Sequence, residues 1–173
     1  VRREKLNRLI ELGIDPYPAA LFPVKDYSTE IHNNFSDGKS VTVAGRLMSR
    51  RIQGNASFAE LQDSKGKIQL YFNRDEICDS DDKSKYNEVY KKLLDIGDII
   101  GIEGKLFKTK VGEKTIMVKD FTILSKSLRP LPLPKEDNEG NTYDEFNDPE
   151  LRYRQRYVAV SYTHLRAHET DHD

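Results

Sequence analysis

The stretch from Ser57 to Asn73 reads SFAELQDSKGKIQLYFN and decides the fold. Apolar and polar residues alternate on both sides of Asp63–Gly66, a loop of turn-forming residues, which predicts two antiparallel strands joined as a hairpin. The loop sets the register of the hairpin, so that Leu61 faces Ile68 on one side. We expect this apolar side to face the core.

The opposite side of the hairpin carries the first candidate binding residues. The same register places Phe58 opposite Tyr71 and Glu60 opposite Gln69. Burial does not explain an aromatic ring on this polar side, whereas an exposed ring on a sheet is a platform on which a base can stack. The amide of Gln69 has one acceptor and two donors, which can tell one base edge from another. The alternatives are that Phe58 packs under an N-terminal helix and that Gln69 merely faces water.

The pattern outside the hairpin completes the fold prediction. Residues 41–48, 98–107 and 114–124 alternate like strands, and residues 83–95 have a helical period. Three strands, a helix and two strands predict a mainly β fold, a five-stranded OB-fold Greek-key barrel with an inserted helix. The second and third strands and the loops of this fold commonly bind oligonucleotides. A five-stranded barrel without a ligand is the alternative.

The two ends of the chain have a different character from the barrel. Arg2–Leu12 predicts a basic amphipathic helix that ends at Gly13, because the prolines of Asp15–Pro18 cannot continue it. This helix either packs on its own domain with a solvated outer face or lies near phosphates. After the barrel, alternating prolines and then acidic residues predict an extended connector. We therefore expect four segments: a basic helix at 1–18, the OB-fold at 25–126, the connector at 127–158 and an atypical tail at 159–173.

Two loops of the predicted barrel carry further candidate residues. Arg46, Arg50 and Arg51 precede the loop at residues 52–56, and we expect them to place three guanidinium groups at the end of the first two strands. Arginine suits bidentate contacts to phosphates or bases, and it also stacks on them. Glu113, expected at the tip of the loop between the fourth and fifth strands, would accept hydrogen bonds from base N–H groups and repel phosphates. Each feature alone is also typical of an ordinary charged loop.

The composition of the 173 residues limits the function classes. The net charge is −1, which argues against a protein that holds nucleic acid by bulk charge alone. The apolar runs are too short for a membrane helix, and the single cysteine, Cys78, favours a cytoplasmic protein without disulfides. No secretory signal is expected. His164, His168 and His172 lie four residues apart but have no thiolate or supporting group, so we expect no metal site.

Ten short motifs, in order along the chain, carry a resemblance to a known family. They are Arg2–Leu6, Gly13–Pro18, Val43–Arg46, Ser57–Phe58, Leu61–Asp63, Ile68–Tyr71, Gly97–Gly101, Gly104–Thr109, Leu128–Pro132 and Leu151–Val158. Together these motifs resemble bacterial class II lysyl-tRNA synthetase, from residue 2 to about residue 158. Phe58 and Gln69 alone would equally suit the related aspartyl and asparaginyl enzymes.

The resemblance implies a function and roles for single residues. The family uses ATP and magnesium to form lysyl-adenylate and then transfers lysine to tRNA(Lys); the full-length enzyme is a cytoplasmic homodimer with no membrane association. Its N-terminal OB-fold reads the anticodon. Phe58 would stack on the central anticodon uridine, with Gln69 and Arg51 hydrogen-bonding near it and Glu113 near the first anticodon base. The basic residues of the N-terminal helix would approach the tRNA stem: Arg2, Arg3, Lys5 and Arg8.

The sequence departs from the family after Val158. The family continues into its first class II motif and the catalytic sheet, whereas Ala159–His164 begins an unrelated sequence. We therefore expect the catalytic domain to be absent from this chain, no cofactor to be bound by it, and the chain alone to be inactive in aminoacylation. The alternative is a free-standing OB-fold module that binds tRNA or single-stranded nucleic acid without catalysis.

Overall fold

The computed structural model describes residues 1–130 and, beyond them, residues 135–136, 142–143, 153–154 and 156. The chain divides into two compact units, Val1–Arg129 and Pro130–Asp173. In the second unit, strand β6 (Lys135–Glu136) pairs antiparallel with β7 (Thr142–Tyr143). The predicted tail and most of the predicted connector lie outside the described residues, and those boundaries stay predictions.

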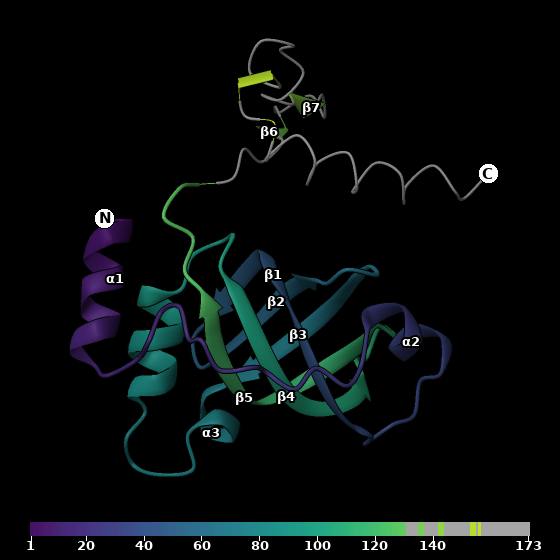
Figure 1. Cartoon of the computed structure of the whole chain (residues 1–173). Helices are drawn as coiled ribbons and strands as arrows, with labels where there is room; N and C mark the ends of the chain where they lie inside the picture. Colours follow the sequence, from purple (N-terminus) through teal and green to yellow (C-terminus); the bar gives the residue numbers. More distant parts are fainter. Residues whose placement is uncertain (131–134, 137–141, 144–152, 155, 157–173) are drawn as a thin grey trace. The chain divides into compact units, whose positions relative to one another are not determined.

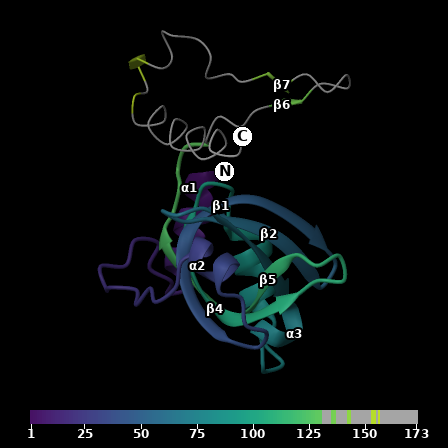
Figure 2. The ribbon, with the colours of Figure 1, turned by 90° about the vertical axis from the view of Figure 1, so that its right-hand side faces the viewer.

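The first unit is built around a closed five-stranded barrel in the order β1-β2-β3-β5-β4 (Figure 1). Seen after a rotation of 90°, the strands of the barrel form a ring (Figure 2). Neighbouring strands are antiparallel except for β3 and β5, which pair in parallel over three residues and close the ring. The strands are β1 (Ser40–Gln53), β2 (Ala56–Gln62), β3 (Lys67–Asn73), β4 (Ile99–Lys108) and β5 (Lys114–Ser125). The prediction of an OB-fold barrel is confirmed.

The β2–β3 hairpin has the register that its loop predicts. Leu61 pairs with Ile68 and Phe58 pairs with Tyr71. Burial alternates along both strands, so that Leu61 and Ile68 are buried in the barrel core while Phe58 and Tyr71 are only partly buried on the outer face. The hairpin therefore brings an aromatic pair to the outside of the barrel.

Strand β1 is longer than its alternation predicts. It continues to Gln53, with an irregularity between Leu47 and Ser49, and only Gly54 and Asn55 form the turn to β2. Gly54 has a φ of +61°, a left-handed conformation that glycine adopts without strain and that a two-residue hairpin turn requires. The prediction of a flexible loop at residues 52–56 is therefore wrong. Most of it is strand, which extends the β1–β2 sheet toward the candidate site.

Helices close the two ends of the barrel. At one end α2 (Ser28–Asn33) begins where the Asp63 carboxylate accepts hydrogen bonds from the backbone N–H and the hydroxyl of Ser28. At the other end lies the π-helix η1 (Lys85–Leu93), the teal helix beside α1 in Figure 1. It buries Tyr86, Val89, Tyr90 and Leu93, and the ring of Tyr90 stacks on Phe72 with 4.0 Å between centroids.

Two helices were not predicted, and one was predicted too long. Helices α2 and α3 (Arg74–Ile77) have six and four residues, too few for a hydrophobic period to be read. The predicted helix at 83–95 is observed only at Lys85–Leu93. Its last residues instead turn toward β4, because Asp98 accepts a hydrogen bond from the backbone of Asp95.

The N-terminal helix α1 (Arg2–Glu11) packs on η1 through the buried Leu9. It also holds the point at which the chain leaves the barrel, because Arg2 donates hydrogen bonds to the carbonyl oxygens of Ser127 and Ile96, each at 3.1 Å. Next to this contact, the fully buried Lys126 forms ion pairs with Asp95 and Asp98. The predicted packing of this helix on its own domain is confirmed, and its position near phosphates stays a prediction.

Candidate nucleic-acid interface

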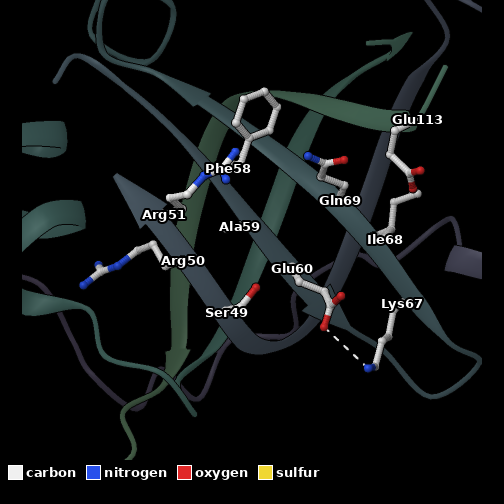
Figure 3. A pocket seen from close by; sticks show the side chains of 10 residues that line it. All are labelled: Ser49, Arg50, Arg51, Phe58, Ala59, Glu60, Lys67, Ile68, Gln69 and Glu113. Carbon is white, nitrogen blue, oxygen red and sulfur yellow. Dashed lines mark ion pairs between the residues drawn. The ribbon is translucent and has the colours of Figure 1, made fainter. Parts of the chain in front are cut away.

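A hollow of about 400 Å³ lies on the outer face of β1, β2 and β3 (Figure 3). Each of the three strands contributes three consecutive residues to the lining, and Glu113, just before β5, adds one at the edge. Because side chains alternate across a strand, Phe58, Glu60 and Gln69 present side chains to the hollow, whereas Ala59 and Ile68 are buried in the core. The lining residues are Ser49, Arg50, Arg51, Phe58, Ala59, Glu60, Lys67, Ile68, Gln69 and Glu113.

Phe58 lies on this face as part of an aromatic row. Its ring centroid is 5.0 Å from that of Tyr71, which in turn is 5.9 Å from that of Phe107 on β4. The rings are tilted at 49° and 70°, so each supports the next by edge contacts rather than by full stacking. The alternative interpretation, in which Phe58 is buried beneath the N-terminal helix, is wrong, because α1 packs on η1 instead. The row leaves Phe58 partly exposed on a sheet, as a base-stacking ring requires.

Gln69 is next to Phe58 in the hollow and has a defined neighbour on β5. The hydroxyl of Thr115 lies 3.4 Å from the Gln69 side-chain oxygen and donates to it. Thr115 is fully buried and is the parallel register partner of Gln69. The alternative that Gln69 merely faces water is wrong, since the amide is partly buried and hydrogen-bonded.

The three arginines of β1 do not form one cluster. Arg51 is exposed, lines the hollow and is the cross-strand partner of Phe58. The guanidinium of Arg50 instead donates to the carbonyl oxygen of Tyr90 and lies 5.3 Å from the centre of its ring. Arg46 donates to the carbonyl oxygen of Gly97 at 2.9 Å and does not line the hollow. The prediction that all three arginines gather at the β1–β2 turn is wrong, because Arg46 pairs with Gln62 at the far end of β2.

Glu113 lies at the base of its loop rather than at the tip. Its carbonyl oxygen accepts from the Thr109 N–H at 3.0 Å, and its own N–H donates to the Thr109 hydroxyl at 3.1 Å. These bonds extend the β4–β5 ladder and leave Val111 and Gly112 at the tip. The carboxylate of Glu113 thereby lies at the edge of the hollow, on the side of Gln69 (Figure 3).

The charges around the hollow are of both signs. Lys67 and Glu60 form an ion pair at 3.5 Å across the hairpin, while Arg51 and Glu113 lie at opposite sides of the lining (Figure 3). A surface that binds phosphates by neutralisation alone would be uniformly basic. This arrangement of a ring, an amide and single charges is instead suited to reading the edges of unstacked bases.

The basic residues of α1 have protein partners, with one exception. Lys5 donates to Asp95 at 2.5 Å, and Arg8 to Glu88 at 2.7 Å, while Arg2 holds Ser127 and Ile96. Arg3 is exposed and, among the residues that the structure describes, has no such partner. Within that part of the chain, Arg3 thus presents the free charge of this helix.

Tyr71, Phe107 and Thr115 belong to the site but were not predicted for it. Tyr71 could have been found, since the hairpin register places it opposite Phe58. Phe107 and Thr115 could not, because they reach the site only through the β4–β5 ladder and the parallel β3–β5 closure.

No helix in the described part of the chain is long and apolar enough to span a membrane. The same part contains no group of three or more His, Cys, Asp or Glu side chains that could hold a metal ion. The histidines at 164, 168 and 172 lie outside the described residues.

Residues 41–124 match a family of tRNA anticodon-type domains described as the OB-fold nucleic acid binding domain. The matched residues span the barrel strands, including the hollow, and exclude α1.

The wider chain is similar to lysine–tRNA ligases. It is 73% identical over 161 residues to the lysine–tRNA ligase of Christiangramia forsetii, a match that covers 93% of this chain and 28% of the ligase. It is 53% identical to that of Porphyromonas gingivalis and 47% identical to that of a Thermoanaerobacter species, over 92% of this chain in both cases. These matches cover 28% and 30% of the two relatives, so the chain spans less than a third of the curated relatives it matches.

Proposed function

We propose that the OB-fold domain binds the anticodon loop of tRNA(Lys) as part of a lysine–tRNA ligase. The observation that carries this proposal is the combination of Phe58, Gln69 and Arg51 in one hollow on the outer face of β1–β3. The similarity of nearly the whole chain to lysine–tRNA ligases supports tRNA(Lys) over the tRNAs of the aspartyl and asparaginyl enzymes.

The hollow suggests a separate role for each residue. The ring of Phe58 stacks on the central anticodon base, while Gln69 and Arg51 donate hydrogen bonds to its edge. Glu113, at the opposite wall, accepts from the N–H groups of the first anticodon base. Arg50 acts indirectly, because its bond to Tyr90 holds β1 against η1 beside the hollow.

Arg46 and helix α1 support the site from further away. Arg46 fixes β1 to the turn before β4 through Gly97. Helix α1 lies near the tRNA stem, where Arg3 supplies the free charge and Arg2, Lys5 and Arg8 act mainly by holding the helix in place.

The activity of the parent ligase is proposed from the same similarity. It would attach lysine to tRNA at the expense of ATP, with Mg²⁺, as a cytoplasmic homodimer. ATP and Mg²⁺ are proposed to act in a part of the ligase beyond the share that this chain covers. The chain alone should therefore show no lysine-dependent pyrophosphate exchange above background.

The decisive experiment is a titration of the 173-residue chain with an anticodon stem-loop of tRNA(Lys). The proposal expects tighter binding than to the same loop with a changed central base, and tighter binding than to an unstructured single strand of equal length. Equal affinity for all three would support a general single-strand binder and overturn anticodon reading. Phe58→Ala serves as the site control, since loss of one base stack weakens binding by about 1 to 3 kcal/mol.

A further inference from the structure

Thr115 is fully buried at the edge of the hollow. Its hydroxyl lies within hydrogen-bonding distance of the Gln69 side chain, which is proposed to read a base. Thr115 lies beside Gln69 because the barrel closes there: Gln69 is the first residue of the parallel β3–β5 pairing and Thr115 is its partner. Its side chain is completely shielded from solvent. A buried hydroxyl needs a hydrogen-bond partner, and here the available acceptors are few.

The Thr115 hydroxyl has two candidate acceptors and one proton. It lies 3.4 Å from the side-chain oxygen of Gln69 and 3.3 Å from the carbonyl oxygen of Glu113. The Glu113 carbonyl oxygen also accepts the Thr109 N–H at 3.0 Å in the extended ladder, so it is already hydrogen-bonded without Thr115. The Gln69 side-chain oxygen has no other donor among the described residues, so the Thr115 hydroxyl is the protein group available to hold it.

This bond decides which end of the Gln69 amide enters the hollow. The oxygen is turned toward β5, and the NH₂ group points toward Phe58 (Figure 3). Arg51, the cross-strand partner of Phe58, carries only donors as well. A base stacked on Phe58 thus meets hydrogen-bond donors at the edge next to Gln69 and Arg51.

We propose that Thr115 is a positioning residue that fixes Gln69 as a donor and so makes the hollow select uracil over cytosine. This inference rests on the proposed function of the hollow. Uracil presents carbonyl oxygens on both sides of its N3, whereas cytosine presents an amino group in place of one of them. With the amide held as a donor, the cytosine amino group meets a second donor and leaves both without an acceptor, which is the more costly mismatch. Without the Thr115 hydroxyl the amide turns over and presents its oxygen to cytosine.

The test compares stem-loops with uracil or cytosine at the central anticodon position, and its readout is the ratio of their dissociation constants. Thr115→Val keeps the shape and removes the hydroxyl, so the preference for uracil should fall about threefold to tenfold, the scale of one net hydrogen bond. Thr115→Ser should retain the preference. Thr122→Val makes the same change at an exposed threonine of β5 and should leave the ratio unchanged.

A double variant separates positioning from a general effect on the fold. In a Gln69→Leu background the hydroxyl has no amide to hold, so adding Thr115→Val should not change the ratio further. The inference is overturned if Thr115→Val weakens both stem-loops by the same factor, if Thr115→Ser does not retain the preference, or if the double variant loses further preference. Urea midpoints of all variants show which fraction is folded in each titration.

The same experiment distinguishes this inference from the proposed function. If Phe58→Ala weakens both stem-loops while Thr115→Val leaves the ratio intact, the hollow binds the loop but Thr115 does not set its specificity. If the unaltered chain binds both loops equally, or Phe58→Ala binds as well as the unaltered chain, the proposed function fails and the inference fails with it.

Discussion

The side-chain nitrogen of Lys126 lies 2.8 Å from Oδ2 of Asp98, and neither side chain is exposed. The same nitrogen is 2.7 Å from Asp95, and Asp98 also accepts the backbone N–H of Ser127 at 2.8 Å. Two buried charges of opposite sign thus share a satisfied hydrogen-bond network where the chain leaves the barrel. Removing one partner would leave the other buried and uncompensated.

We expect Lys126→Met to lower the free energy of unfolding by about 3 to 5 kcal/mol, because methionine fills the space but leaves the carboxylate of Asp98 without a countercharge. The measurement is urea denaturation at neutral pH. Lys119→Met is the matched control: Lys119 on β5 pairs with Glu76 on α3, but both side chains are 44% exposed. Equal midpoints for the two variants would show that the buried network does not stabilise the fold.

The same network predicts that the free energy of unfolding depends on pH. Burial raises the pKa of Asp95, but the hydrogen bonds and charges of Lys126 and Lys5 outweigh it, so its pKa lies below the ordinary 3.8. A carboxylate whose pKa is lowered by folding stabilises the native state above its unfolded pKa, and this stabilisation is lost as the pH falls through the folded value. The difference in unfolding free energy between the unaltered chain and Asp95→Asn should thus be constant above about pH 4 and shrink below it.

Urea titrations of both proteins at several pH values from neutral down to about 2.5 test this dependence. A difference that grows on acidification would have the wrong sign and would exclude the ion pairs as its source. Asp75→Asn is a useful comparison, because the Arg74 hydrogen bond lowers the pKa of Asp75 as well, but the Asp75 side chain is 59% exposed.

Substitutions of Phe58 separate binding from stability. Phe58→Ala should weaken anticodon stem-loop binding by about 1 to 3 kcal/mol, while the urea midpoint changes far less than for a core aromatic, whose truncation costs about 3 to 5 kcal/mol. Phe58→Tyr keeps the π-face and should retain most of the affinity. Phe58→Leu keeps apolar volume without the face and should not. A large loss of stability with unchanged affinity of the folded fraction would make the ring structural.

Two basic residues of helix α1 test whether a side chain without a protein partner contributes more to tRNA binding than one in an ion pair. Arg3→Ala should reduce the slope of log affinity for tRNA against log salt by about one, as expected for one lost phosphate contact, and leave stability unchanged. Lys5→Ala should do the reverse, since Lys5 is bonded to Asp95. If both variants change the salt dependence equally, the pairing of Lys5 does not remove it from the tRNA surface.

Local patterns predicted the part of the site that the chain builds from neighbouring residues. The hairpin register follows from period-two alternation and one loop, so the alternation alone places Phe58 and Gln69 together. The length of β1 could not be predicted, because Arg50–Gln53 are strand only by pairing with Ala56–Ala59. Arg50 and Arg46 were misplaced for a related reason, since their partners Tyr90 and Gly97 come from η1 and the turn after it.

The parallel closure of β3 on β5 has a consequence for the order of assembly. The β2–β3 hairpin can pair as soon as those residues leave the ribosome, but Thr115 follows Gln69 by 46 positions, and their contact needs the whole chain between them. A nascent or nicked chain that has only the hairpin would carry the Phe58 ring and Gln69 without the Thr115 hydroxyl that is proposed to orient the amide. Full discrimination would therefore be acquired last, together with the cooperative closing of the domain.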